Sequence, residues 1–152
     1  LKDPTNFGTS TVATATTRRQ IYATIFSSVS GTFTADEEIN QATTGAVAKV
    51  IEFDSTNKIL YYYQTRFPDV GTDTNGNLTA ISGANAITGQ SSSASATPNT
   101  SSSATVNGVT FASGYANPEL AYDSGDIIYV EERSPITRAS DQTENVKLII
   151  EF

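Results

Sequence analysis

Residues 46–67, AVAKVIEFDSTNKILYYYQTRF, contain the best-defined local element of this 152-residue chain. Two runs rich in β-branched and aromatic residues, 46–53 and 58–67, flank the four polar residues 54–57. Two such runs separated by a short polar linker are typical of a β-hairpin. We therefore predict one antiparallel strand on either side of residues 54–57.

The rest of the chain also favours strands and turns over helices. Thr, Ser, Ala and Gly are frequent and Leu is sparse, a composition typical of β-rich proteins. Residues 18–29 predict a strand with two packing faces, one carrying Ile21, Ala23 and Ile25 and the other Tyr22, Thr24 and Phe26. The fold class that we predict is mainly β, an antiparallel sheet body with an inserted small β-barrel or sandwich module and little helix.

Shorter signals place the remaining elements. Thr44-Gly45 predicts a turn after a short strand that ends near Ile39, and Asn107-Gly108 predicts a tight hairpin or the re-entry of a strand. Pro118 followed by Glu119 predicts a single helical turn.

We expect residues 1–30 and 111–152 to form the sheet body and residues 31–110 to form the inserted module. The body is expected to end in a hairpin over 126–152, with a capped turn at 141–144. Residues 89–105, GQSSSASATPNTSSSAT, carry no large apolar side chain, so a flexible loop is expected there. The start at Leu1, without a methionine, fits a processed product or an excised fragment.

Composition excludes several classes of chemistry. The chain has no cysteine and no histidine, which removes thiolate sites and the usual general base and metal ligand. The net charge of -7 repels phosphate backbones, so no nucleic-acid partner is expected. No apolar run approaches the ~18 residues of a membrane span, so no membrane partner is expected. We predict no catalytic, cofactor-binding or metal-ligating residues and no cofactor.

Three groups of carboxylates suggest a cation site or a catalytic site instead, but each of these alternatives is weakly supported. The run Asp36-Glu37-Glu38 has the composition of a cation site, but such runs are usually solvated. The stretch DTNGNL at 73–78 imitates the start of a calcium loop, but its glycine is misplaced and no glutamate closes it. Glu131 and Glu132 are adjacent on a predicted strand, so they point to opposite faces. We favour a structural salt bridge from one of these glutamates to Arg133, Arg138 or Lys147. An enzyme that uses carboxylates alone is the third and least favoured hypothesis for the function of the chain.

The run Tyr61-Tyr62-Tyr63 is the main candidate for a contact surface. Tyrosine offers flat apolar area with a polar tip, which suits protein interfaces and sugar rings. On a strand, Tyr61 and Tyr63 share one face and Tyr62 takes the other. We expect one face in the core and one at the surface, and we assign a possible interface to residues Tyr61, Tyr62, Tyr63, Arg133, Pro135 and Arg138.

The closing segment carries a resemblance to a known family. Residues 123–152, DSGDIIYVEERSPITRASDQTENVKLIIEF, combine Ser124-Gly125, an apolar strand over 127–130, the Glu131, Arg133, Pro135-Ile136 pattern, the acidic run 141–144 and a final Phe152. This order resembles the C-terminus of the baseplate wedge protein of T-even-type contractile-tailed phages. Residues 1–8, LKDPTNFG, are similar to a segment in the second half of the same protein.

The resemblance implies a virion structural protein without enzymatic activity. Its expected location is the tail baseplate of the virion, after assembly in the host cytoplasm. Its expected partners are the other wedge proteins and, in the full-length protein, a second copy. Residues 31–110 depart from the enterobacterial members and look more like small β-modules in structural proteins of marine cyanophage relatives. The alternative function is a β module that binds carbohydrate or a host surface through Tyr61 to Tyr63 and the loop at 89–105.

Overall fold

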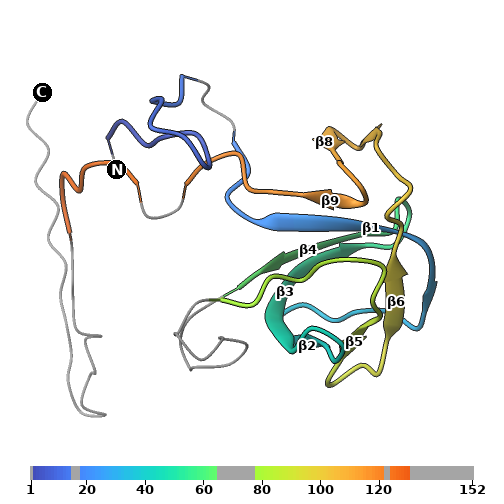
Figure 1. The fold of residues 1–152 in the computed structure, drawn as a ribbon. Helices are drawn as coiled ribbons and strands as arrows, with labels where there is room; N and C mark the ends of the chain where they lie inside the picture. The colour runs from blue at the N-terminus through green and yellow to red at the C-terminus, as the bar shows by residue number, and fades with distance from the viewer. Residues whose placement is uncertain (1, 15–17, 65–77, 122–123, 131–152) are drawn as a thin grey trace, which may run out of the picture.

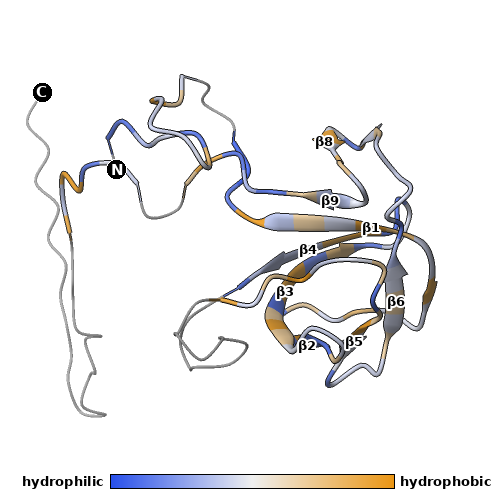
Figure 2. Ribbon diagram, in the orientation of Figure 1, coloured by the Kyte–Doolittle hydropathy of each residue, from blue (hydrophilic) through white to orange (hydrophobic). Residues whose placement is uncertain are grey.

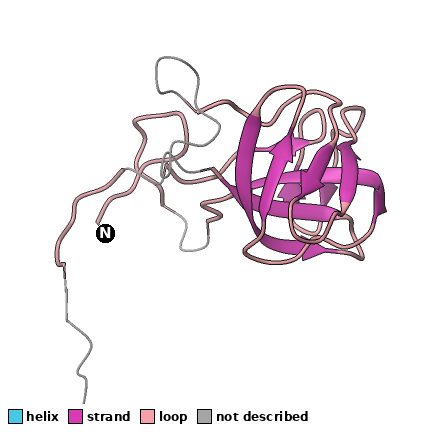
Figure 3. Cartoon of the chain, turned by 90° about the horizontal axis from the view of Figure 1, so that it is seen from below, coloured by secondary structure: helices cyan, strands magenta, loops and turns pink. Residues whose placement is uncertain are grey.

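Six strands form a closed antiparallel barrel. The computed structural model describes residues 2–14, 18–64, 78–121 and 124–130, and these residues form strands and loops without a helix (Figure 3). The barrel strands are β1 (Tyr22–Ser30), β2 (Glu38–Gln41), β3 (Ala46–Asp54), β4 (Ile59–Tyr63), β5 (Ile87–Gly89) and β6 (Ser95–Pro98). Their order is β4-β3-β2-β5-β6-β1, and a further pairing of β4 with β1 closes the ring (Figure 1). The prediction of a mainly β fold with a small barrel is confirmed.

The predicted hairpin of residues 46–67 is present as β3 and β4. Asp54 pairs with Ile59, and the register shifts at a β-bulge between Val50 and Glu52. A bulge adds one residue to one strand and so changes which side chains face inward. As a result, Val50 and Phe53, three residues apart, both pack into the barrel interior.

Strand β1 packs on both of its faces, as its sequence predicted. Tyr22 and Phe26 face the barrel interior, where Phe26 stacks on Phe33 at 6.0 Å between ring centroids. The alternate residues Ala23 and Ile25 are also buried, but in a second cluster on the outside of the barrel. The barrel wall at β1 is therefore a layer between two hydrophobic cores.

The outer cluster is covered by the chain that follows the barrel. Strands β7 (Thr105–Val106) and β8 (Val109–Thr110) form a hairpin, and β9 (Tyr115–Ala116) pairs with β1. Asn107 and Gly108 both have positive φ, as a two-residue hairpin turn requires, so this predicted turn is confirmed. Val109, Phe111 and Ala116 pack on the outer faces of β1 and β4.

The segment expected to be a flexible loop, residues 89–105, contains β6. Ala94, Ala96 and Pro98 are buried there, and β6 pairs with both β1 and β5. Small side chains let neighbouring backbones approach closely, so a strand needs no large apolar residue at such a position. The helical turn predicted at Pro118 is wrong, because Glu119 and Leu120 instead donate backbone hydrogen bonds to the carbonyl of Arg19 at 2.6 and 3.3 Å.

The first residues and the residues after β9 lie side by side, away from the barrel (Figure 1). Lys2 and Asp126 exchange two backbone hydrogen bonds of 2.9 and 2.8 Å, and Phe7 donates to the carbonyl of Glu119 at 3.0 Å. Strand β1 belongs to the barrel, where both of its edges are hydrogen-bonded. The division of the chain into a sheet body and an inserted module stays a prediction.

The burial of Ile59 in the outer cluster predicts how its substitution changes the free energy of unfolding. Ile59 is 0% exposed in that cluster, whereas Ile51, at the bulge, is 41% exposed. We expect Ile59→Ala to lower the free energy of unfolding by about 2–5 kcal/mol, since it removes packed methyl groups and leaves a cavity. Ile51→Ala is the matched control and should cost less than about 1 kcal/mol. Urea unfolding followed by circular dichroism measures both; equal losses would show that the outer cluster is not a packed core.

Candidate functional site

The three tyrosines on β4 lie in three different environments. Tyr62 is 2% exposed in the barrel interior, where burial raises the pKa of its hydroxyl. Tyr61 is half-buried against the outer cluster, and its pKa is also raised, first by burial and then by Asp54 and Glu52. Tyr63 is 36% exposed. The run therefore does not present one continuous aromatic surface, and Tyr63 is the tyrosine of this run best placed to contact another molecule.

Arg133, Pro135 and Arg138 lie outside the described residues, as do Glu131, Glu132 and Lys147. Most of the calcium-like stretch at 73–78 and the predicted capped turn at 141–144 also lie outside them.

An apolar strip, residues 127–130, follows the pairing of Lys2 with Asp126. Ile127, Ile128, Tyr129 and Val130 are each 70–73% exposed. Figure 2 shows this strip as an apolar stretch at the end of the described chain, apart from the barrel. Alternate residues of an extended chain point to opposite sides, so both sides of the strip are apolar and exposed. Strands that are buried on both faces have this composition.

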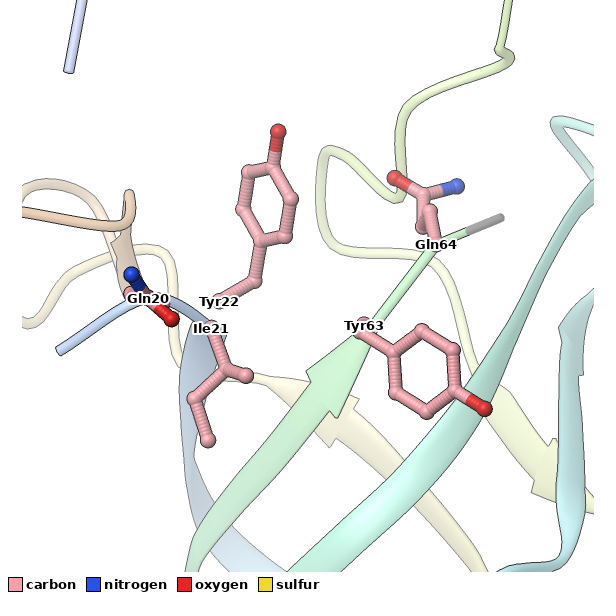
Figure 4. A pocket seen from close by; sticks show the side chains of 5 residues that line it. All are labelled: Gln20, Ile21, Tyr22, Tyr63 and Gln64. Carbon is pink, nitrogen blue, oxygen red and sulfur yellow. The ribbon is translucent and has the colours of Figure 1, made fainter. Parts of the chain in front are cut away.

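A pocket of about 280 Å³ lies where β1 and β4 meet at one end of the barrel. Gln20, Ile21, Tyr22, Tyr63 and Gln64 line it (Figure 4). Tyr22 pairs with Tyr62 across the two strands, and this register brings the ends of both strands together. Sequence reasoning assigned Tyr22 to packing and missed the two glutamines, because no sequence pattern reports which residues pair across β1 and β4.

The acidic run Asp36-Glu37-Glu38 contains one buried carboxylate. Glu37 is 5% exposed, and its oxygens accept hydrogen bonds from the backbone of Thr34, Ser91 and Ser92 at 2.7–3.1 Å and from the Ser92 hydroxyl at 2.8 Å. A Cβ at Gly89 would lie 2.7 Å from both carboxylate oxygens, so a side chain there would displace the carboxylate from its donors. Burial raises the pKa of Glu37, but the hydrogen bonds outweigh it and the net pKa is lowered.

Glu37 is thus neither solvated nor open to a cation, and it ties the start of β2 to the turn between β5 and β6. In the part of the chain that the structure describes, no group of three or more metal-ligating side chains is placed to hold an ion. The same residues include no helix long and apolar enough to cross a membrane.

A comparison with protein-family models decides the family. The model described as "Bacteriophage T4, Gp8" matches residues 65–152, more than half of the chain. The chain belongs to this family. Gp8 is a structural protein of the baseplate wedge, found in the virion at the tail baseplate, and the family implies other baseplate proteins as partners. No match was found among curated proteins or among solved structures.

The residues matched by the Gp8 family model include only part of the barrel. The match covers β5 to β9 and the apolar strip, while β1 to β4 precede it. Since the match to the phage T4 model reaches back to residue 65, the expectation that residues 31–110 have no counterpart in the enterobacterial members is wrong for residues 65–110. Residues 1–8 lie outside the match, so their similarity to the family stays a prediction.

The Glu37 network predicts a specific pH dependence. A folded pKa below the ordinary 4.5 means that the carboxylate stabilises the fold above that pH, and that this contribution is lost as pH falls through the folded pKa. Glu37→Gln places an amide NH2 against backbone donors, so we expect a loss of about 1–3 kcal/mol at pH 7.

Urea unfolding measured at a series of pH values from 7 downward tests this. The difference between wild type and Glu37→Gln should shrink as pH falls through the folded pKa, which lies below 4.5, because the wild-type carboxyl then becomes protonated. Glu38→Gln, at the exposed neighbouring position, is the control and should change stability by less than about 0.5 kcal/mol. A pH-independent loss in Glu37→Gln would contradict the assignment of a buried, ionised carboxylate.

Proposed function

We propose that this chain is a structural component of the phage tail baseplate wedge that acts through protein–protein interfaces and has no enzymatic activity. Membership of the Gp8 family is the observation that carries the proposal. The partners are other wedge proteins, and assembly takes place in the host cytoplasm before the virion is complete.

The apolar strip 127–130 is the proposed contact surface for a neighbouring wedge protein. It lies inside the Gp8 match, and its four apolar side chains are more than two-thirds exposed. An exposed apolar segment of this kind is unfavourable in an isolated chain and marks an interaction site. An extended segment can also pair its backbone with a strand of the partner, which gives affinity through main-chain hydrogen bonds.

Arg133, Pro135 and Arg138 follow the strip in the same matched stretch, and we assign them to the same interface. Arginine suits the rim of such a contact, since its planar guanidinium binds carboxylates in a bidentate way. Of the tyrosine run, Tyr63 is the member whose exposure suits contact with another molecule.

Two finer features complete the proposal. The full-length protein forms a homodimer, which sedimentation analysis of that protein tests. The chain comes from a marine cyanophage-like member of the family, a proposal that the Thr/Ser-rich composition of residues 31–110 supports.

The experiment is co-purification of the full-length protein with the other wedge proteins of the same phage. We expect the double substitution Ile127→Ser and Tyr129→Ser to weaken the association at least tenfold, because it makes one side of the strip polar. Ile51→Ser is the matched control, an exposed isoleucine on β3 in the barrel, and should bind as wild type.

Two outcomes would contradict the assignment of the strip. One is binding by the double variant that equals wild type. The other is a large loss of folding stability in the double variant, measured by thermal denaturation, which would mean that the strip is covered within its own chain.

A further inference from the structure

The pocket between β1 and β4 has the chemistry of a small ligand site that membership of the Gp8 family does not explain. Its volume of about 280 Å³ lies just below the roughly 300–1,000 Å³ of pockets for drug-sized ligands. A single six-membered ring is therefore the right size of occupant. The pocket is open to solvent, and none of the described residues that line it is charged.

Two aromatic rings stand at the pocket, one from each strand (Figure 4). The Tyr22 ring is held in place by stacking on Tyr62, at 5.6 Å between centroids and 17° between planes, and by an edge contact with Phe7 at 6.1 Å. Tyr63 is partly exposed beside it. Rings that are already ordered lose little conformational entropy when a ligand stacks on them.

Gln64 adds an oriented hydrogen-bond acceptor. Its amide NH2 donates to the carbonyls of Thr79 at 2.6 Å and Val47 at 3.2 Å, which fixes the amide plane. In Figure 4 the amide oxygen of Gln64 points to the Tyr22 side, away from the amide nitrogen that donates to those carbonyls. Gln20 lies on the other side of the pocket and is exposed, so its amide offers both a donor and an acceptor.

We propose that this pocket binds a neutral sugar ring, a pyranose unit of a glycan. The apolar face of such a ring stacks on tyrosine, and its hydroxyl groups donate to an acceptor such as the Gln64 oxygen. An anionic ligand is disfavoured, because the described residues that line the pocket include no cation and the chain has a net charge of -7. A purely apolar ring or a proline side chain would leave the oriented amide oxygen without a donor.

The proposal places sugar binding on Tyr63 and Tyr22, one on each strand, rather than on the run Tyr61 to Tyr63. Tyr62 supports the site from inside the barrel by holding Tyr22. The pocket lies on β1 and β4, which precede the Gp8 match, so it is independent of the proposed wedge interface at 127–130.

Saturation-transfer NMR on the whole chain tests the proposal with four probes, glucose, galactose, mannose and N-acetylglucosamine. We expect transfer to the ring protons of at least one of them at millimolar concentration. Tyr63→Ala should weaken that binding about tenfold, and Tyr63→Phe, which keeps the ring, should stay within about twofold of wild type. Ile51→Ala, an exposed isoleucine that does not line the pocket, should bind as wild type.

Cyclohexylmethanol serves as an apolar probe of similar ring size. Transfer to this probe without transfer to any of the four sugars would overturn the proposal, since the pocket would then recognise apolar shape alone. Absence of transfer to all probes would also overturn it, as would sugar binding that survives Tyr63→Ala unchanged. Circular dichroism of each variant confirms that the barrel is intact.

Discussion

The structure depends on strand β1 being hydrogen-bonded along both edges and buried on both faces over residues 23–26. One edge pairs with β4, while the other pairs with β9 over its first residues and with β6 over its last. Thr24 shows how tight this constraint is, because it is fully buried and its hydroxyl must donate to the carbonyl of Gly114, at 2.9 Å. Barrel closure, the outer hydrophobic cluster and the pocket all follow from the position of this one strand.

Local pattern was enough to predict the elements whose signal lies within a few residues. The β3–β4 hairpin, the two faces of β1 and the turn at Asn107-Gly108 all depend on short-range periodicity or on residues that tolerate positive φ. The bulge near Ile51 and strand β6 were not predictable in this way. The bulge depends on how β3 fits a curved barrel, and β6 is built from small residues whose burial depends on strands far away in the sequence.

The candidate site was predictable only in part, for the same reason. Alternation along β4 correctly separated Tyr62 from Tyr61 and Tyr63, but only the closed barrel decides which face is interior. The environment of Glu37 was likewise not predictable from the neighbouring residues. Its sequence context predicts a solvated carboxylate, whereas the donors that bury it come from Ser91 and Ser92, more than fifty residues later. A run of charged residues shows only the local composition. The hydrogen-bond donors that pair with those charges are determined by the tertiary structure.

The two surfaces of the molecule are suited to different tasks because they differ in order and in chemistry. At the pocket the Tyr22 ring is already stacked on Tyr62, which favours a small ligand that is bound without rearrangement. The strip at 127–130 is an extended, apolar segment anchored at Asp126 by its pairing with Lys2, which favours a partner that covers it on both sides. Contact through the strip requires a partner with a matching apolar surface.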